Sequence, residues 1–214
     1  MKIFLRWYEF EAEPESWRNS VTKVKAPRLT EEPLEPVEVQ DVHKMAGVCD
    51  SSFLGRRDKA VSFFLLDTGL RAKEFLLLDL EDIDLVSGSV LVRLGKGRKP
   101  RTVFFDNQTR KALRERSDSL PALWLTDDKT TRLAYGGLRP IQKRRAEVIG
   151  IPSPKARDFR SAFALAMLRD GVDLITLSRL MGHTSIKVLQ RYLKHLPEDL
   201  QETHRRGSPV DKAS

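Results

Sequence analysis

One pair of β-rich runs interrupts a chain whose other segments mostly repeat their apolar residues at helical spacing. The runs cover residues 89–94 and 101–105, and the turn between them holds Gly95 and Gly97 among basic residues. Two short β-rich runs around a glycine-containing turn predict an antiparallel hairpin, here with a positively charged tip. We therefore expect an α+β fold that is mainly helical and contains one small antiparallel sheet.

Helical periodicity accounts for most of the remaining chain. Residues 1–13 have an aromatic-rich helical pattern, and residues 14–37 carry four prolines among charged residues, which favours an extended linker. We expect residues 1–13 to be the end of a helix whose domain lies upstream. Gly, Pro and Ser/Thr signals separate the other predicted helices, which cover 39–48, 59–66, 72–78, 108–116, 138–148, 155–169, 174–181, 186–193 and 198–205.

The charge and the cysteine content narrow the possible functions. The chain has 38 Lys and Arg against 30 Asp and Glu, a formal net charge of +8, which suits a polyanion such as nucleic acid but also many soluble proteins. No run reaches the roughly 18 consecutive apolar residues of a membrane span, so we expect a cytoplasmic protein. Cys49 has no second cysteine to pair with, which excludes an internal disulfide and a multi-cysteine zinc site.

Arg71 follows a glycine turn at Gly69 and begins a largely apolar helical segment. This context predicts that Arg71 lies close to the core. Glu74 stands three residues later, where its carboxylate can pair with Arg71 on the helix surface. The same carboxylate could instead orient the guanidinium toward a ligand.

One predicted helix in the second half of the chain places two arginines near each other. Phe159, Phe163 and Met167 recur every four residues and predict a buried stripe. Arg157 and Arg160 fall on a neighbouring face and should project together. They are either ordinary solvated charges or a phosphate clamp, since guanidinium groups match phosphate oxygens in bidentate geometry.

A histidine and a tyrosine complete the set of candidates. His183 comes directly after a helix-ending Met181-Gly182 pair and is expected in a turn between two helices. It is a capping or core histidine, or a group that contacts a ligand. Tyr192 lies in the following helix, where a tyrosine is either a packed aromatic or a nucleophile.

Together these features resemble the tyrosine recombinase, or phage integrase, family over residues 27–206. The anchors occur in the family's order and with its typical spacing, and they are Thr68-Gly69-Leu70-Arg71 with Glu74, Gly95-Lys96-Gly97, Arg157 with Arg160, Leu180 to His183, and Tyr192. The resemblance implies the catalytic-domain fold of that family for residues 27–206. It also implies that residues 1–26 are the end of a missing N-terminal DNA-binding domain plus a linker, and that residues 207–214 are a flexible tail.

The resemblance implies site-specific DNA recombination, by integration or excision, through a covalent intermediate. The hydroxyl of Tyr192 would attack a DNA phosphodiester, form a 3′-phosphotyrosyl bond and release a 5′-hydroxyl that later attacks another strand. Arg71 and Arg160 match the arginines that stabilise the charge of the transition state. Lys96 matches the hairpin lysine that protonates the leaving oxygen, and His183 matches the histidine that hydrogen-bonds the scissile phosphate. Neither a cofactor nor a metal ion is implied.

Arg157 departs from the family, which most often has histidine at this position. An arginine cannot act as a base at neutral pH. We therefore expect Arg157 to bind phosphate, while the proton of Tyr192 leaves to water or to the phosphate itself. In the hairpin turn, Arg98 and Lys99 lie close enough to Lys96 to replace it.

Double-stranded DNA is the implied partner, and the family's C-terminal segment implies a homotetramer assembled on two DNA sites. Contacts with the DNA backbone would position the protein without reading the sequence. The predicted contact residues are Arg93, Arg98, Lys99, Arg101, Lys143, Arg144 and Arg145. The alternative for all of them is an ordinary solvated basic surface.

Three other functions stay open at this point. The chain could be a catalytically silent DNA-binding relative, a type IB topoisomerase that uses similar chemistry to relax supercoils, or a helical transcription regulator that binds DNA passively. The intact set of Arg71, Lys96, Arg160, His183 and Tyr192 argues against the silent relative. The sequence around these residues looks more like integrases than topoisomerases.

Overall fold

The computed structural model describes residues 2–12, 19, 35–93, 100–114, 122–182 and 186–193. The chain divides into two compact units, Met1–Pro33 and Leu34–Ser214. The first unit contains helix α1 (Lys2–Ala12), which confirms the helical pattern predicted for residues 1–13. The predicted helix 198–205 and most of the predicted linker lie outside the described residues.

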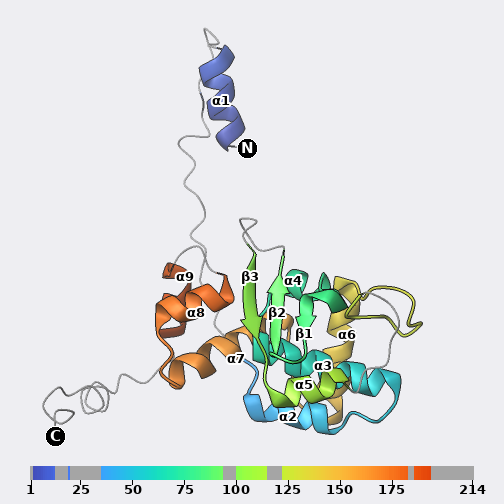
Figure 1. Cartoon of the computed structure of the whole chain (residues 1–214). Coiled ribbons are helices and arrows are strands. Elements are labelled where there is room, and N and C mark those ends of the chain that lie inside the picture. Colours follow the sequence, from blue (N-terminus) through green and yellow to red (C-terminus); the bar gives the residue numbers. More distant parts are fainter. Residues whose placement is uncertain are drawn as a thin grey trace, which may run out of the picture. The chain divides into compact units, whose positions relative to one another are not determined.

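The second unit is mainly helical with one small sheet, as predicted (Figure 1). Three strands pair antiparallel in the order β1-β2-β3. The elements of this unit are α2 (Val39–Gly47), α3 (Phe53–Thr68), α4 (Ala72–Leu76), η2 (Leu80–Asp82), β1 (Ile83–Asp84), β2 (Ser89–Val92), β3 (Arg101–Phe104), α5 (Asn107–Arg114), α6 (Tyr135–Val148), α7 (Ala156–Arg169), α8 (Leu174–Met181) and α9 (Lys187–Leu193). Strands β2 and β3 are the arms of the predicted hairpin. The sequence missed β1 because two residues are too few to show alternation.

Helix α3 begins earlier than its apolar pattern predicts. The hydroxyl of Ser52 caps its start by accepting a hydrogen bond from the backbone of Gly55 at 3.1 Å. In the first turns Arg57 and Asp58 are buried as an ion pair, with 2.9 Å between nitrogen and oxygen. Two buried charges interrupt the apolar periodicity, so the pattern predicted a helix only from residue 59.

An aromatic group forms the centre of the larger hydrophobic cluster. The rings of Phe75 and Trp124 stack with 4.4 Å between their centroids, and Phe64 meets Trp124 edge-on at 5.4 Å. All three are fully buried, and each such side chain contributes roughly 1.5–3 kcal/mol to folding. Phe159 of α7 belongs to the same cluster, so this core fixes the N-terminal half of α7.

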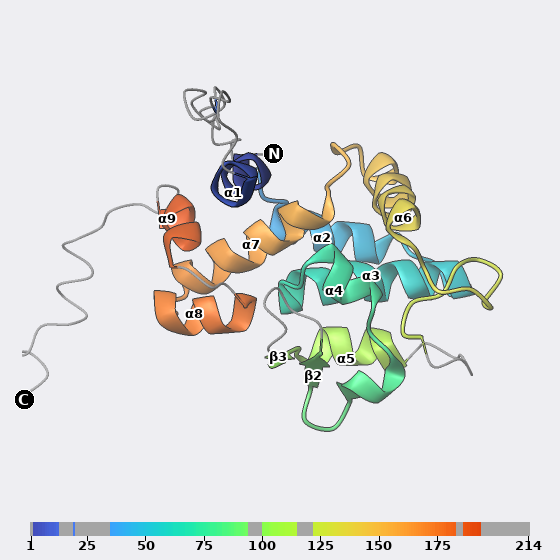
Figure 2. The ribbon, with the colours of Figure 1, turned by 90° about the horizontal axis from the view of Figure 1, so that it is seen from above.

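A smaller cluster joins the last three helices. It includes Phe163 of α7, Leu177 and Met181 of α8, and Leu189 and Tyr192 of α9. Figures 1 and 2 show α8 and α9 lying against the C-terminal half of α7. The apolar stripe predicted along α7 is confirmed, because its side chains contribute to both clusters.

Candidate active site

Three arginines from distant parts of the sequence meet at the C-terminal end of α8. Arg71 directly precedes α4, Arg101 begins β3 and Arg160 lies in α7. Each donates a hydrogen bond to one of three consecutive carbonyl oxygens. The distances are 3.0 Å from Arg101 Nε to Leu180 O, 2.7 Å from Arg160 Nη2 to Met181 O and 3.0 Å from Arg71 Nη2 to Gly182 O. We call Arg71, Arg101 and Arg160 the arginine cluster.

The end of α8 attracts guanidinium groups for a physical reason. The last carbonyl groups of a helix have no N–H partner within the helix and carry the negative end of its dipole. Gly182 ends α8 with a left-handed φ of 62°, a conformation that glycine adopts at little cost. A Cβ on Gly182 would lie 2.8 Å from Arg101 Cζ, so the glycine also leaves room for the guanidinium.

Glu74 binds two of the three arginines. Its side chain is 3% exposed and lies 2.9 Å from Arg71 Nη1 and 2.7 Å from Arg101 Nη2. Burial alone would raise the pKa of Glu74, but hydrogen bonds from Arg101 and Arg71 outweigh it and lower that pKa. Glu74 is therefore an anion at neutral pH. The contact with Arg71 expected from the sequence is present, although it is largely buried rather than on the surface.

Arg160 is the most buried member of the arginine cluster. Its Nη1 donates to Gly69 O at 2.5 Å. Burial, and after it the charge of Arg71, lowers the pKa of Arg160 to about 10, so the group is still charged at neutral pH. Gly69 has a left-handed φ of 58°, and a Cβ there would lie 2.3 Å from the ring of Phe163. Only glycine therefore presents this carbonyl to Arg160 without a clash.

Tyr192 packs against the helices whose residues hold the arginine cluster. It is 6% exposed and packs on α9 among Phe163, Met181 and other members of the smaller hydrophobic cluster. Its negative charge, when ionised, raises the pKa of Arg160. Met181 connects the two groups, because its side chain packs in the cluster of Tyr192 and its carbonyl oxygen accepts a hydrogen bond from Arg160.

Four predicted residues lie outside the described part of the chain, and their roles stay predictions. They are Lys96, Arg98, Lys99 and His183. The residues at the edges of these two segments are described. Arg101 lies at the base of the hairpin that carries Lys96, and Gly182 directly precedes His183. Each of the two segments therefore lies next in sequence to a residue that belongs to the arginine cluster or contacts it.

Arg157 and Arg160 differ in environment although both lie near the start of α7. The side chain of Arg157 is 57% exposed, and its Nε lies 3.5 Å from Asp158. Arg160 is buried and points toward Gly69 and α8. The two arginines do not project together as the helical pattern predicted, and a phosphate contact of Arg157 stays a prediction.

The predicted DNA-contact residues that the structure describes divide into two groups. Arg93, Lys143 and Arg144 are exposed, as a contact with a polyanion requires. Arg145 is largely buried and forms an ion pair with the buried Asp58 at 2.9 Å. Arg101 is 12% exposed and belongs to the arginine cluster. The sequence analysis placed Arg101 among the contacts with the DNA backbone and not inside the site.

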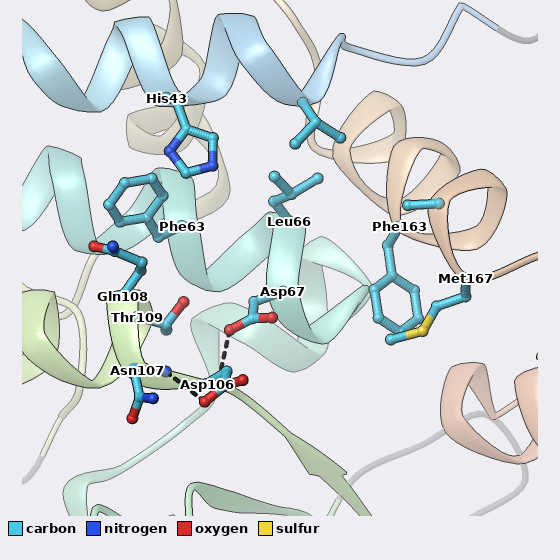
Figure 3. A pocket seen from close by; sticks show the side chains of 12 residues that line it. His43, Phe63, Leu66, Asp67, Asp106, Asn107, Gln108, Thr109, Phe163 and Met167 are labelled. Atoms are coloured by element: carbon cyan, nitrogen blue, oxygen red, sulfur yellow. Dashed lines mark hydrogen bonds between the residues drawn. The ribbon is translucent and has the colours of Figure 1, made fainter. Parts of the chain in front are cut away.

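A cavity of about 350 Å³ lies between α2, α3, α5 and α7 (Figure 3). The side chains of His43, Phe63, Leu66 and Met167 point toward it, with Asp67 at its edge. None of the described residues that line this cavity is a predicted site residue. The cavity therefore belongs to the packing around α3 and not to the arginine cluster.

Two further observations concern metals and membranes. Among the described residues, no three His, Cys, Asp or Glu side chains gather as a metal site would require. The described helices include none with the length and apolar character needed to cross a membrane.

Cys49 is partly buried, and burial raises the pKa of its thiol to about 11. The thiol is therefore protonated at neutral pH and a poor nucleophile.

Comparison with known proteins identifies similar sequences over most of the chain. The model of the phage integrase family matches residues 36–199. Tyrosine recombinase XerA of Saccharolobus solfataricus is 31% identical over 188 residues, which are 88% of this chain and 62% of that protein. The chain thus spans less than two thirds of the length of this relative.

Solved structures share the fold at lower identity. A crystal structure of XerA recombinase has a TM-score of 0.68 at 22% identity and covers 90% of this chain and 69% of that one. The structure of the Tn1549 transposon integrase in complex with circular intermediate DNA has a TM-score of 0.70 at 15% identity, covering 95% and 75%. These similarities confirm the predicted fold class.

Proposed function

Because this chain belongs to the phage integrase family of tyrosine recombinases, we propose that it cuts and rejoins duplex DNA at specific sites through a covalent bond to Tyr192. The observation that carries the proposal is that Tyr192 packs in the same hydrophobic cluster as Met181, whose carbonyl oxygen binds Arg160. Arg71 and Arg101 meet Arg160 at the end of α8, and the three guanidinium groups outnumber the carboxylate of Glu74. A surplus of fixed positive charge beside a nucleophile suits phosphoryl transfer.

The relatives support the class of substrate. The similar protein of Saccharolobus solfataricus is named a tyrosine recombinase, and the Tn1549 integrase structure contains DNA. We propose double-stranded DNA as the partner of this chain, with integration or excision as the reaction. The net charge of +8 fits such a polyanion. A homotetramer assembled on two DNA sites is part of the same proposal.

The proposed step exchanges one phosphoester bond for another. The phenolic oxygen of Tyr192 attacks phosphorus, the bond to the 5′ oxygen breaks, and the 3′ phosphate stays on the tyrosine. Later attack by a 5′-hydroxyl breaks the phosphotyrosyl bond and rejoins a strand. Because the energy of the broken bond is kept in the covalent intermediate, the reaction needs no ATP.

The proposed roles follow the charges that develop during attack. Arg71 and Arg160 stabilise the nonbridging oxygens of the transition state. The family resemblance assigns Lys96 to protonate the leaving oxygen and His183 to hydrogen-bond the scissile phosphate. The proton of Tyr192 leaves to water or to the phosphate, because Arg157 cannot accept it at neutral pH.

We also propose that residues 27–206 form the catalytic domain. The segment matched by the family, residues 36–199, falls within these limits. Residues 1–26 would then be the end of a DNA-binding domain with its linker, and residues 207–214 a tail.

Nicked duplexes whose cleaved fragment diffuses away test the proposal. We expect a pool of such duplexes to yield denaturant-resistant protein–DNA adducts that mass spectrometry maps to Tyr192. The Tyr192→Phe variant should bind the same DNA and give no adduct. DNA binding by the wild-type chain without any adduct would instead identify a catalytically silent relative. Relaxation of supercoiled plasmid that needs no paired sites would indicate a type IB topoisomerase.

A further inference from the structure

We infer that Arg101 is a positioning residue for the proposed reaction, which acts through Glu74 to hold the guanidinium of Arg71 in place at the end of α8. The inference rests on the proposed function and extends it, because the family resemblance gave Arg101 no part in the chemistry. Arg101 need not touch the DNA to fill this role.

The contacts of Arg101 use every nitrogen of its guanidinium. Nη1 and Nη2 donate to the two carboxylate oxygens of Glu74 at 3.0 and 2.7 Å. Nε donates to Leu180 O at 3.0 Å, and the side chain is 12% exposed. A guanidinium held by a bidentate carboxylate and a carbonyl has a fixed orientation. Arg101 therefore influences bound DNA through its neighbours.

Glu74, which Arg101 holds in a fixed orientation, in turn orients Arg71. The carboxylate oxygens that bind Arg101 also accept hydrogen bonds from Arg71, at 2.9 Å from its Nη1 and 3.0 Å from its backbone nitrogen. Glu74 is buried and anionic, and a buried anion requires counter-charge. Because Arg101 supplies much of that charge, Arg71 is only partly engaged by Glu74. Its side chain, which is 29% exposed, can then face an incoming phosphate.

The position of Arg101 connects the Arg101–Glu74 pair to the hairpin and to the end of α8. Arg101 of β3 lies opposite Val92 of β2, which is the described residue pair nearest to the tip of the hairpin. Its guanidinium lies against Gly182, where a Cβ would approach Cζ to 2.8 Å, and the carbonyl of Gly182 accepts from Arg71. Displacing Arg101 would shift Arg71 and the turn that leads to His183 together.

Lysine cannot take the place of Arg101, even though it keeps the charge. A single ammonium nitrogen does not reproduce the planar fork that binds both oxygens of a carboxylate. It also cannot bind Glu74 and Leu180 O in the directions that the guanidinium uses. Without the fork, Glu74 would draw the guanidinium of Arg71 toward itself and away from the phosphate.

Arg101→Lys and Arg101→Gln in the full chain test the inference by single-turnover cleavage of the nicked duplex. At saturating DNA, we expect the rate constant for adduct formation to fall about 10- to 100-fold, the loss typical of a misplaced reacting geometry. The Kd for the duplex should change little, because the exposed basic residues that would contact the DNA backbone are untouched. The Arg101 variants should thus slow the chemical step without weakening the binding of DNA.

A duplex with a methylphosphonate at the scissile position distinguishes positioning from a general structural defect. The methyl group replaces a charged nonbridging oxygen, so less negative charge remains for Arg71 to stabilise. We expect the loss caused by Arg101→Lys to shrink on this substrate, as the loss caused by Arg71→Lys should. A general structural defect would slow cleavage of both substrates equally.

Arg132→Gln is the matched control. Arg132 also binds a carboxylate, Asp79 at 2.5 Å, and the backbone carbonyls of Leu76 and Leu78, each at 3.1 Å, but it lies outside the arginine cluster and does not bind Glu74. We expect this variant to lose thermal stability as the Arg101 variants do, while its folded fraction cleaves at the wild-type rate.

The wild-type chain and Tyr192→Phe are measured in the same assay. If the wild-type chain forms no adduct, the proposed function and this inference both fail. If it does form the adduct and the Arg101 variants cleave as fast as wild type, only the inference on Arg101 is overturned. An equal loss on the two substrates would overturn it as well.

Discussion

Glu74 is a buried anion paired with two arginines, and this pairing makes folding stability depend on pH in the acid range. Hydrogen bonds from Arg101 and Arg71 lower the pKa of Glu74 below its usual 4.5. A lowered folded-state pKa means that the stabilisation is complete above the unfolded-state pKa and is lost as the pH falls through the folded-state value. We expect Glu74→Gln to cost about 3 kcal/mol at neutral pH. The difference from wild type should shrink below pH 4.5.

Urea unfolding of both proteins, from neutral pH down to about pH 3, measures this difference. Glu147→Gln is the control, since Glu147 is exposed and lies 3.5 Å from the exposed Lys143, and such surface pairs contribute little. Its stability should follow that of wild type at every pH. A gap between wild type and Glu74→Gln that stays constant through the acid range would contradict the lowered pKa of Glu74.

Arg157 allows a second test at the scale of one residue. It is exposed in the first turn of α7, at the position where tyrosine recombinases most often have histidine. Because imidazole can accept the proton that arginine cannot, we expect Arg157→His to preserve or raise the single-turnover rate of adduct formation. The rate is to be followed across the titration range of histidine. Complete loss of cleavage would mean that the guanidinium itself is required.

The role of Arg101 shows why single residues are hard to place from sequence. The sequence presented it as one of several basic residues near the hairpin tip. Strand alternation held a usable signal, because Arg101 shares its face of β3 with the buried Val103. An arginine in phase with a core residue needs an anion nearby. The pattern could not identify Glu74 as that anion, since the two are brought together only by the fold.

At the scale of elements, periodicity predicted the helices and strands well and their contacts poorly. Helix α8 covers the predicted residues, and the arms of the hairpin are present. The stripe along α7 was predicted because its large apolar residues repeat regularly. The hydrogen-bond partners of Arg160 were not predicted, because the carbonyl groups of Gly69 and Met181 come from other elements. Periodicity shows which face of a helix is buried, but not what covers it.

The turn after α8 offers a test at this scale. Gly182 and Gly171 both have a left-handed φ, of 62° and 87°, so alanine at either position costs roughly 1–2 kcal/mol of backbone strain. A Cβ at Gly171 meets open space, whereas a Cβ at Gly182 would lie 2.8 Å from Arg101 Cζ. We expect Gly182→Ala to lose more stability than Gly171→Ala and to slow adduct formation, which Gly171→Ala should leave unchanged.

Thermal unfolding and single-turnover cleavage of the two glycine variants provide the comparison. The φ of Gly171 lies further from the left-handed region that alanine tolerates, so backbone strain alone would not make Gly182→Ala the more damaging change. An excess effect at Gly182 therefore reports the contact with Arg101. Equal stability and equal cleavage rates would show that the guanidinium moves aside without consequence. That result would also weaken the role inferred for Arg101.

At the scale of the whole molecule, the order of motifs along the chain was sufficient to predict the fold of the second unit. The anchors are spread from Thr68 to Tyr192, so they constrain most of that unit at once. Their meeting point could not be predicted in the same way. The convergence of three arginines on the end of α8 depends on how α7, β3 and the segment before α4 pack in space.

Residues 34–214 should fold and perform the chemical step without residues 1–33. Both hydrophobic clusters, the arginine cluster and Tyr192 belong to this unit. We expect the fragment 34–214 to unfold within about 2 °C of the full chain, which corresponds to less than roughly 1 kcal/mol at this size. Its adduct-forming rate at saturating DNA should equal that of the full chain. Its Kd for DNA should rise if residues 1–26 belong to a DNA-binding domain. A folded fragment that cleaves more slowly at saturating DNA would show that residues 1–33 contribute to the chemical step itself.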